Sequence, residues 1–393
     1  MKSCLLPRIL VTTAYPFRTC LLAGLILVGA SCGGGDGSTT GSTTPATALP
    51  AFVAYTPSAG VIASKKTVAS PSFSGTPALR GPQACLATLS NNVHDQTHTT
   101  TFAGAGVSET DQQEIADYAE AAVKELRTKF SVSASIGFYG KKIEVCVQPE
   151  SPNNTGAAAI ALSPSGSLAV LSPSAYFLLP GVGGRNAFVP RRNNVYQQEF
   201  ISRLLVHEMT HVYTDSRHVS SPNLTNELWF EEGIAEFMAW GKVNLDKARI
   251  LAELNFLNPL KGPSLVNGVS NYSSLNDSVG GRYTGALAAV TFLMSPTGAN
   301  NPLSAVGSVQ DKLNAEFERL QNEHFAAAIA ACNIQPTLPV CAAPFSLSDA
   351  QKSEVFTRVF ESTFKEKDGS GMKLRSGTNN LQDTLIARIT AFW

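Results

Sequence analysis

The sequence predicts an α+β protein with a sheet-bearing N-terminal half and a helical C-terminal half. Short runs of β-favouring or alternating apolar residues end near residue 171, whereas apolar residues at helical spacing dominate from residue 195 onward. The 393 residues are 44% hydrophobic and 15% charged, as in a globular chain with a sizeable core. We expect an upper lobe over residues 83–216 and a lower lobe over residues 217–393, with one helix at the seam.

The first 31 residues have the features of a signal peptide. Arg18 precedes a short apolar run at residues 21–28, and small residues lead directly to Cys32. This ending resembles a bacterial lipobox, so we expect Cys32 to be lipidated and to become the mature N-terminus. The mature protein would then be a lipoprotein of the periplasm or outer membrane. Because Gly29 stands where a lipobox usually has Leu, ordinary cleavage and secretion are the alternative.

The segment that follows Cys32 reads as a tether. Residues 33–45 are almost entirely Gly, Ser and Thr, and residues 49–82 are rich in Pro, Ser and Ala, so we expect a flexible connection over residues 32–82. Lys and Arg number 30, as do Asp and Glu, so there is no basic field for nucleic acid. We therefore expect contact with a membrane only through the lipid, and a monomer.

The cysteine count agrees with export. Of the seven cysteines, removing the two in the signal peptide and Cys32 leaves an even number, which suits disulfides in an oxidising compartment. These four allow three pairings. We favour Cys332–Cys341, which are close in sequence with two prolines between them, together with Cys85–Cys146.

Strand and helix signals alternate through the N-terminal half. A β-favouring run at residues 98–102 precedes a helical pattern at 109–130, and an alternating strand follows at 142–147. Two short apolar runs at 157–162 and 168–171 are separated by Ser-Pro-Ser-Gly, which is typical of a hairpin.

The rest of the chain is predicted to be helical. Ser348 and Gln351 fit a capping box at the start of one of these helices. The expected helices cover residues 195–215, 227–243, 282–294, 309–331, 348–364 and 381–392.

The helix at the seam contains His207-Glu208-Met209-Thr210-His211, an HExxH motif. Residues four apart lie on one face of a helix, so both imidazoles can bind the same metal ion. Glu208 lies beside them and can contact a bound water. Two neutral imidazoles and one carboxylate suit Zn²⁺, so we expect about one zinc ion per chain.

The next helix supplies the carboxylate. In the segment Trp229-Phe230-Glu231-Glu232-Gly233-Ile234-Ala235-Glu236, we expect Glu232 to be the third ligand. Glu236 lies one turn later on the same face and can accept the spare ring N–H of a ligand histidine. Bulky apolar neighbours indicate that this helix is buried rather than a solvated acidic face.

HEMTH followed by WFEEGIAEF resembles the gluzincin clan of zinc metallopeptidases, especially the bacterial "peptidase MA-like" group with its W-x-x-E-G-x-A-E pattern. The resemblance covers residues from about 98 to 300 and implies a thermolysin-like fold. It makes His207, His211 and Glu232 zinc ligands and Glu208 the general base. The metzincin pattern does not fit, because positions 214 and 217 are Thr and Arg.

The resemblance also has implications for substrate binding. A short edge strand before the HExxH helix would bind extended peptide, here residues 168–171 or 157–162. The G-x-M-E-N segment of the aminopeptidase branch is absent, which favours endopeptidase activity. Gluzincins usually add a Tyr or His donor for the oxyanion, and the best candidate is Tyr283, with Tyr272 or Arg282 as alternatives.

The sequence therefore predicts an exported zinc metallopeptidase, a hydrolase that cleaves peptide or protein substrates with a zinc-activated water and Glu208 as general base. Two alternatives remain at this stage. One is a non-catalytic, metal-binding scaffold lipoprotein of the same fold, and the other is an amidase that acts on cell-wall material.

The lipobox-like ending generates a prediction of its own. Because the acyl chain is attached to the thiol of Cys32, Cys32→Ser should abolish incorporation of a lipid label and release the protein from membranes. Metabolic labelling with a fatty acid and fractionation measure both effects. An unmodified N-terminus beyond residue 32, found by mass spectrometry, would contradict the prediction.

Overall fold

The computed structural model describes residues 93–138, 140–149, 159–162, 167–173, 195–216, 227–241, 248, 251, 279–335, 337 and 345–392. The predicted signal peptide, Cys32, the tether and Cys85 lie outside these ranges, as do Tyr272 and Cys341. What the sequence predicts for them stays a prediction.

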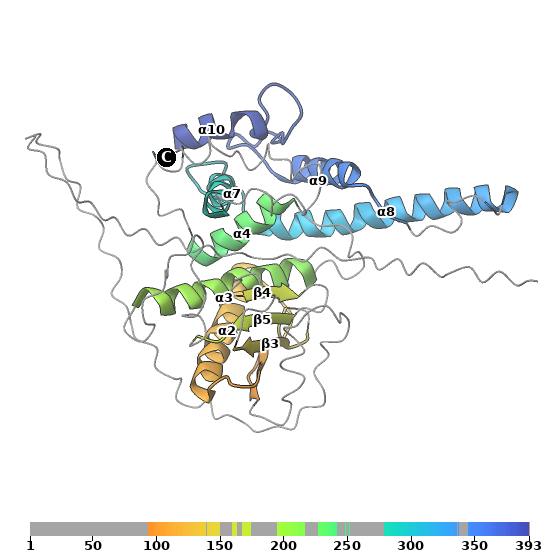
Figure 1. The fold of residues 1–393 in the computed structure, drawn as a ribbon. Coiled ribbons are helices and arrows are strands. Elements are labelled where there is room, and N and C mark those ends of the chain that lie inside the picture. Colours follow the sequence, from red (N-terminus) through yellow and green to blue (C-terminus); the bar gives the residue numbers. More distant parts are fainter. Residues whose placement is uncertain are drawn as a thin grey trace, which may run out of the picture.

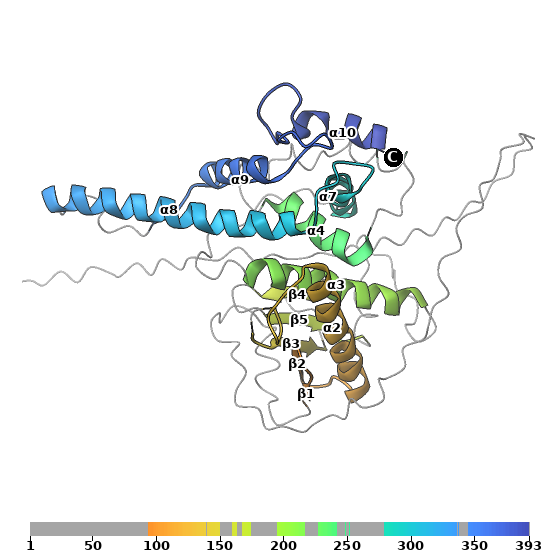
Figure 2. The ribbon, with the colours of Figure 1, turned by 180° about the vertical axis from the view of Figure 1, so that it is seen from behind.

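The N-terminal lobe is built on a five-stranded mixed sheet with strand order β1-β2-β3-β5-β4. The three central strands β2, β3 and β5 are parallel to one another, whereas β1 and β4 pair antiparallel with them at the two edges. Helix α2 (Glu109–Lys129) packs against β1, β2 and β3 (Figure 2). The strands are β1 (His94–Asp95), β2 (Thr99–Ala103), β3 (Ile143–Gln148), β4 (Ala159–Leu162) and β5 (Ser167–Leu171).

Helix α3 (Val195–Ser216) joins the two lobes, and the described remainder of the chain is helical (Figure 1). α3 packs on α2, β4 and β5 on one side and on α4 on the other, while α4 also packs on α7. The helices of this lobe are α4 (Leu228–Trp240), α7 (Val279–Met294), α8 (Ser304–Ile334), α9 (Asp349–Thr363) and α10 (Leu381–Phe392).

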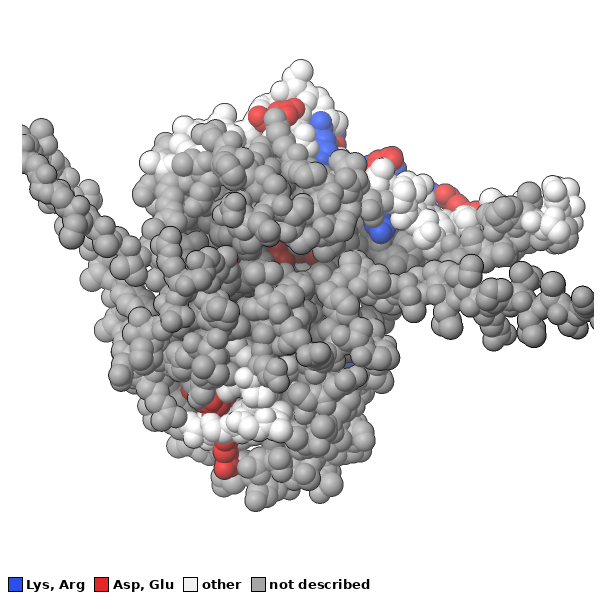
Figure 3. All heavy atoms as spheres, in the orientation of Figure 1, with Lys and Arg blue, Asp and Glu red and all other residues white. Residues whose placement is uncertain are grey.

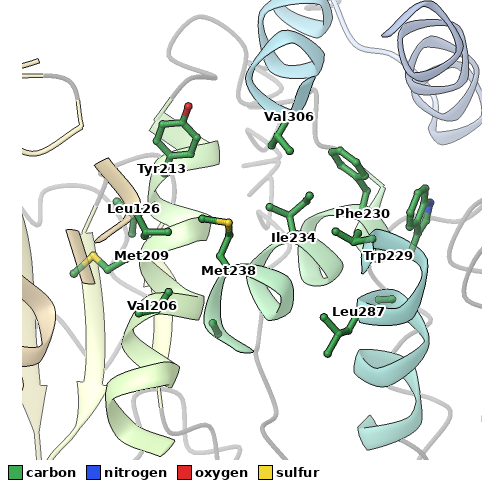
Figure 4. Close-up of a cluster of buried hydrophobic side chains, with 14 of the residues drawn as sticks. Leu126, Val206, Met209, Tyr213, Trp229, Phe230, Ile234, Met238, Leu287 and Val306 are labelled. Carbon is green, nitrogen blue, oxygen red and sulfur yellow. The ribbon is translucent and has the colours of Figure 1, made fainter. Parts of the chain in front are cut away.

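One hydrophobic core runs through both lobes, and α4 lies at its centre (Figure 4). Met238 lies on the side of α4 near α3, and Ile234 lies between Val306 of α8 and the rest of the core. Met209 of α3 is fully buried in the same core. Because both lobes share this core, the relative position of α3 and α4 is set by apolar packing.

Charged side chains of the lower lobe neutralise one another locally. Basic and acidic groups lie side by side along α8 and the elements above it (Figure 3), and Arg319 forms an ion pair with Glu316 on α8 at 2.8 Å. Arg358 of α9 pairs with the same carboxylate. These exposed pairs contribute little to stability but leave this face without a one-sign field.

The predicted elements within the described ranges are confirmed, with shifted ends. The hairpin is present as β4 and β5, and Ser348 forms the expected capping box with Gln351. α4 ends at Trp240, earlier than predicted, because Gly241 adopts φ 77° after it. α8 begins at Ser304, earlier than predicted, because the turn at Pro302 leads directly into the helix.

Cys146 and Cys332 are each disulfide-bonded. Their pairing with Cys85 and Cys341 remains a prediction, since both of those lie outside the described residues. Within the described ranges, none of the helices has the combination of length and apolarity that a bilayer span requires.

Gly233 generates a stability prediction. A Cβ at this position would lie 2.6 Å from the Ala286 carbonyl oxygen and 2.6 Å from Val290 Cγ2 of α7. In Gly233→Ala the overpacking cost of about 1–3 kcal/mol should outweigh the helix-propensity gain of up to about 1 kcal/mol. The free energy of unfolding, measured by denaturant titration, should therefore fall.

Gly371→Ala is the matched control, because the nearest atom to its added Cβ, the Glu361 carbonyl oxygen, is 3.9 Å away. Its unfolding free energy should stay within about 0.5 kcal/mol of wild type. A Gly233→Ala variant as stable as this control would contradict the close packing of α4 and α7.

Candidate metal centre

The HExxH motif lies in the middle of α3, with both histidines buried on one face. His207 and His211 are 1% and 4% exposed, and their Nε2 atoms are 3.1 Å apart. Leu205 and Met209, on other faces of the helix, are fully buried in the core. The apolar side of α3 therefore packs against the sheet and α2, and the two imidazoles face α4.

Glu232 reaches the two imidazoles from α4. Its Oε2 lies 3.3 Å from His207 Nε2 and 3.4 Å from His211 Nε2. In a tetrahedral zinc site with bonds of about 2.0–2.1 Å, any two ligand atoms are about 3.3 Å apart. The separations of 3.1, 3.3 and 3.4 Å are close to that value, and the donor set of two imidazoles and a carboxylate is one that zinc prefers.

Electrostatics at this cluster favour an ionised Glu232. Burial alone would raise the pKa of this carboxyl, but the adjacent rings of His211 and His207 outweigh that effect and hold its pKa well below the usual range. A carboxylate held ionised in a buried site is suited to bind a cation.

Glu236 contacts the first histidine from behind. Its Oε1 is 3.1 Å from His207 Nδ1, on the opposite side of the ring from Nε2. A hydrogen bond from Nδ1 to this carboxylate would fix the tautomer in which Nε2 carries the lone pair, and it would also fix the orientation of the ring. The distance between these two atoms agrees with the sequence-predicted role of Glu236, and the hydrogen bond itself stays a prediction.

Glu208 is buried beside the cluster and is held by the edge strand. Its Oε2 accepts a hydrogen bond from the backbone N–H of Ala161 at 3.0 Å, whereas its buried Oε1 has no hydrogen-bond partner among the described residues. Burial raises the pKa of this carboxyl, although the two histidines oppose the effect. One oxygen is thus fixed and the other is left for a water or a substrate.

The contact with Ala161 decides which strand flanks the site. Of the two candidate strands, β5 is internal, between β3 and β4, and β4 is at the edge of the described sheet. β4 is therefore the strand beside Glu208. Sequence reasoning missed the Ala161 N–H, since a backbone donor leaves no mark in the residue types.

Other predicted residues fall outside what the structure describes. The backbone of Tyr283 belongs to α7, but its side chain and that of Arg282 are outside the description, as is His218. Among the described residues, His207, His211 and Glu232 form the one group of three that could hold a metal ion. His94, His98 and His324 do not join it, as expected from their spacing.

Two comparisons with known proteins gave no match. No protein-family model matches the chain, and no curated protein matches it significantly. The resemblance to gluzincins therefore rests on the two sequence motifs alone.

The cluster predicts metal binding that depends on both helices. The purified chain should contain about one zinc ion, and His211→Ala or Glu232→Ala should release it because each removes one of three protein ligands. Metal analysis after desalting measures the content. His324→Ala, a histidine packed on Phe345 away from the cluster, should retain the metal. Full zinc content in both ligand variants would disprove the site.

Proposed function

We propose that this chain is an exported zinc-dependent metallopeptidase, an endopeptidase with thermolysin-like architecture. The observation that carries the proposal is the buried convergence of His207, His211 and Glu232 at tetrahedral spacing, with the Glu208 carboxylate beside them. A scaffold that only binds metal would have no need for a buried acid at Glu208, which favours the enzyme over that alternative.

His207, His211 and Glu232 would hold the zinc ion, with Glu236 orienting His207. When bound, the metal supplies Lewis-acid polarisation of the scissile carbonyl and lowers the pKa of water. Glu208 takes a proton from the attacking water while the water oxygen bonds to the carbonyl carbon. As the C–N bond breaks, Glu208 delivers that proton to the leaving amine. The Ala161 N–H holds Oε2 throughout, so that Oε1 carries the proton.

The edge strand β4 would hold the substrate in an extended conformation. Ala161 directs its N–H away from β5 and toward Glu208, so by strand alternation Ala159 also directs its backbone groups outward. A peptide that pairs with this edge would pass beside Glu208. Binding through main-chain hydrogen bonds suits an endopeptidase, because it needs no free terminus.

Tyr283 is proposed as the oxyanion donor, with Tyr272 or Arg282 as alternatives. This choice is supported by the close approach of α7 to α4, where Ala286 packs against Gly233. Ala286 lies about one turn after Tyr283, and Gly233 directly follows the proposed ligand Glu232. A phenol there would donate a hydrogen bond without adding charge.

The proposed location follows from the N-terminus. A lipid on Cys32 and the tether over residues 32–82 would hold the enzyme at the outer membrane or in the periplasm, where peptide or protein substrates would reach it. Cleavage without lipidation, and secretion, is the alternative.

Glu208→Gln tests the mechanism. Glutamine keeps the volume but cannot take up the proton, so turnover of a peptide library should fall by about 10²–10⁴-fold while zinc content stays the same. Glu354→Gln is the control and should keep the wild-type rate, because this exposed carboxylate pairs with Arg358 of its own helix α9. Wild-type cleavage by Glu208→Gln would show that another group acts as the base.

A further inference from the structure

The N-terminal end of α4 is held by a polar network centred on Glu227. This residue precedes the helix and is buried. Its Oε2 accepts from the Trp229 indole N–H at 2.7 Å and from Arg375 Nη2 at 2.6 Å, and its Oε1 accepts from Ser353 Oγ at 2.9 Å. Both carboxylate oxygens are therefore bonded, and two of the three donors come from the C-terminal part of the chain.

Arg375 is itself fixed on several sides. Its guanidinium donates to Thr357 Oγ1 of α9 at 2.5 Å and to Gln382 Oε1 of α10 at 3.1 Å. The loop that carries Arg375 is tied to α9 because Glu361 accepts from the Leu374 backbone N–H at 3.0 Å. The ion pair thus joins the start of α4 to a guanidinium that is itself bonded to α9 and α10.

Aromatic packing reinforces the same end of α4. Phe230 lies 5.5 Å from Phe356 and 5.8 Å from Phe364, and Trp229 lies 6.1 Å from Phe360, measured between ring centroids. These contacts hold the helix laterally. The hydrogen bonds of Glu227 are directional, so they are suited to fix the position of α4 along its axis and its rotation about that axis.

That position matters for the metal centre. Glu232 follows Glu227 by five residues, a rise of about 7.5 Å along the helix, and Glu236 by nine. A functional site needs its ligands held within about 0.5 Å, so a small rotation or slide of α4 would move Glu232 from both imidazoles at once. The end of α4 that Arg375 holds is the end nearest Glu232.

We propose that Glu227 and Arg375 are positioning residues for the metal centre, acting through α4 to keep Glu232 and Glu236 at ligand and hydrogen-bond distance from the α3 histidines. The inference rests on the proposed metal centre. It assigns to the C-terminal α9–α10 segment, which supplies no metal ligand among its described residues, a part in metal affinity.

The test compares Arg375→Met with Arg388→Met in the full chain. Arg388 is a matched control, because it forms an ion pair with Glu366 at 2.7 Å in the same lobe. Among the described residues, its hydrogen bonds go to Thr384, Glu366 and Asn379 rather than to α4. Zinc affinity is measured by chelator competition at a temperature where circular dichroism shows both variants folded. Loss of a group that supports a metal ligand typically weakens metal binding by about 10–100-fold, so Arg375→Met should bind zinc at least about tenfold more weakly than wild type. The zinc affinity of Arg388→Met should stay within about twofold of wild type.

Two further variants keep the test decisive. Arg375→Lys preserves the charge and should recover part of the affinity, and Glu227→Gln should weaken binding even if Arg375→Met fails to fold. The cobalt-substituted protein provides a second readout, since its visible spectrum should change in Arg375→Met and not in Arg388→Met.

Wild-type affinity and an unchanged cobalt spectrum in both Glu227→Gln and Arg375→Met would overturn the positioning role and leave the zinc site intact. A wild-type chain that binds neither zinc nor cobalt would instead disprove the proposed function, and the positioning role with it.

Discussion

The packing of α4 against α3 is the constraint on which the rest of this structure depends, because the candidate metal ligands are divided between these two helices. His207 and His211 come from one helix and Glu232 from the other, with oxygen-to-nitrogen separations of 3.3 and 3.4 Å. Three buried polar groups brought this close would be costly without a cation or shared protons. The hydrophobic core that joins the lobes supplies the packing that holds them there.

Different contacts hold α4 in place on its different sides. Toward α7, Gly233 lets the Ala286 carbonyl approach to a distance that a Cβ would forbid. At its N-terminal end, Glu227 and the aromatic pair Trp229 and Phe230 bind it to α9 and the loop that follows. The WFEEGIAE segment thus combines ligands with residues that place them, and its glycine has a packing role beside its ligand neighbour.

Much of this could be predicted from the sequence. Periodicity and β-favouring runs located the described helices and the strands other than β1, and the HExxH spacing with Glu232 and Glu236 identified the cluster. Strand order could not be predicted, because it depends on contacts between distant segments, so the choice of β4 over β5 as the edge strand stayed open. The bond between Ala161 and Glu208 and the pairing of Glu227 with Arg375, 148 residues away, had no local signal.

X-ray absorption at the zinc edge of the purified full chain tests the central claim most directly, because it reports the atoms bound to the metal. We expect nitrogen and oxygen neighbours only, at about 2.0–2.1 Å, with the outer-shell scattering of two imidazoles. Sulfur neighbours at about 2.3 Å, or a zinc ion with no imidazole scattering, would contradict a centre built from His207, His211 and Glu232.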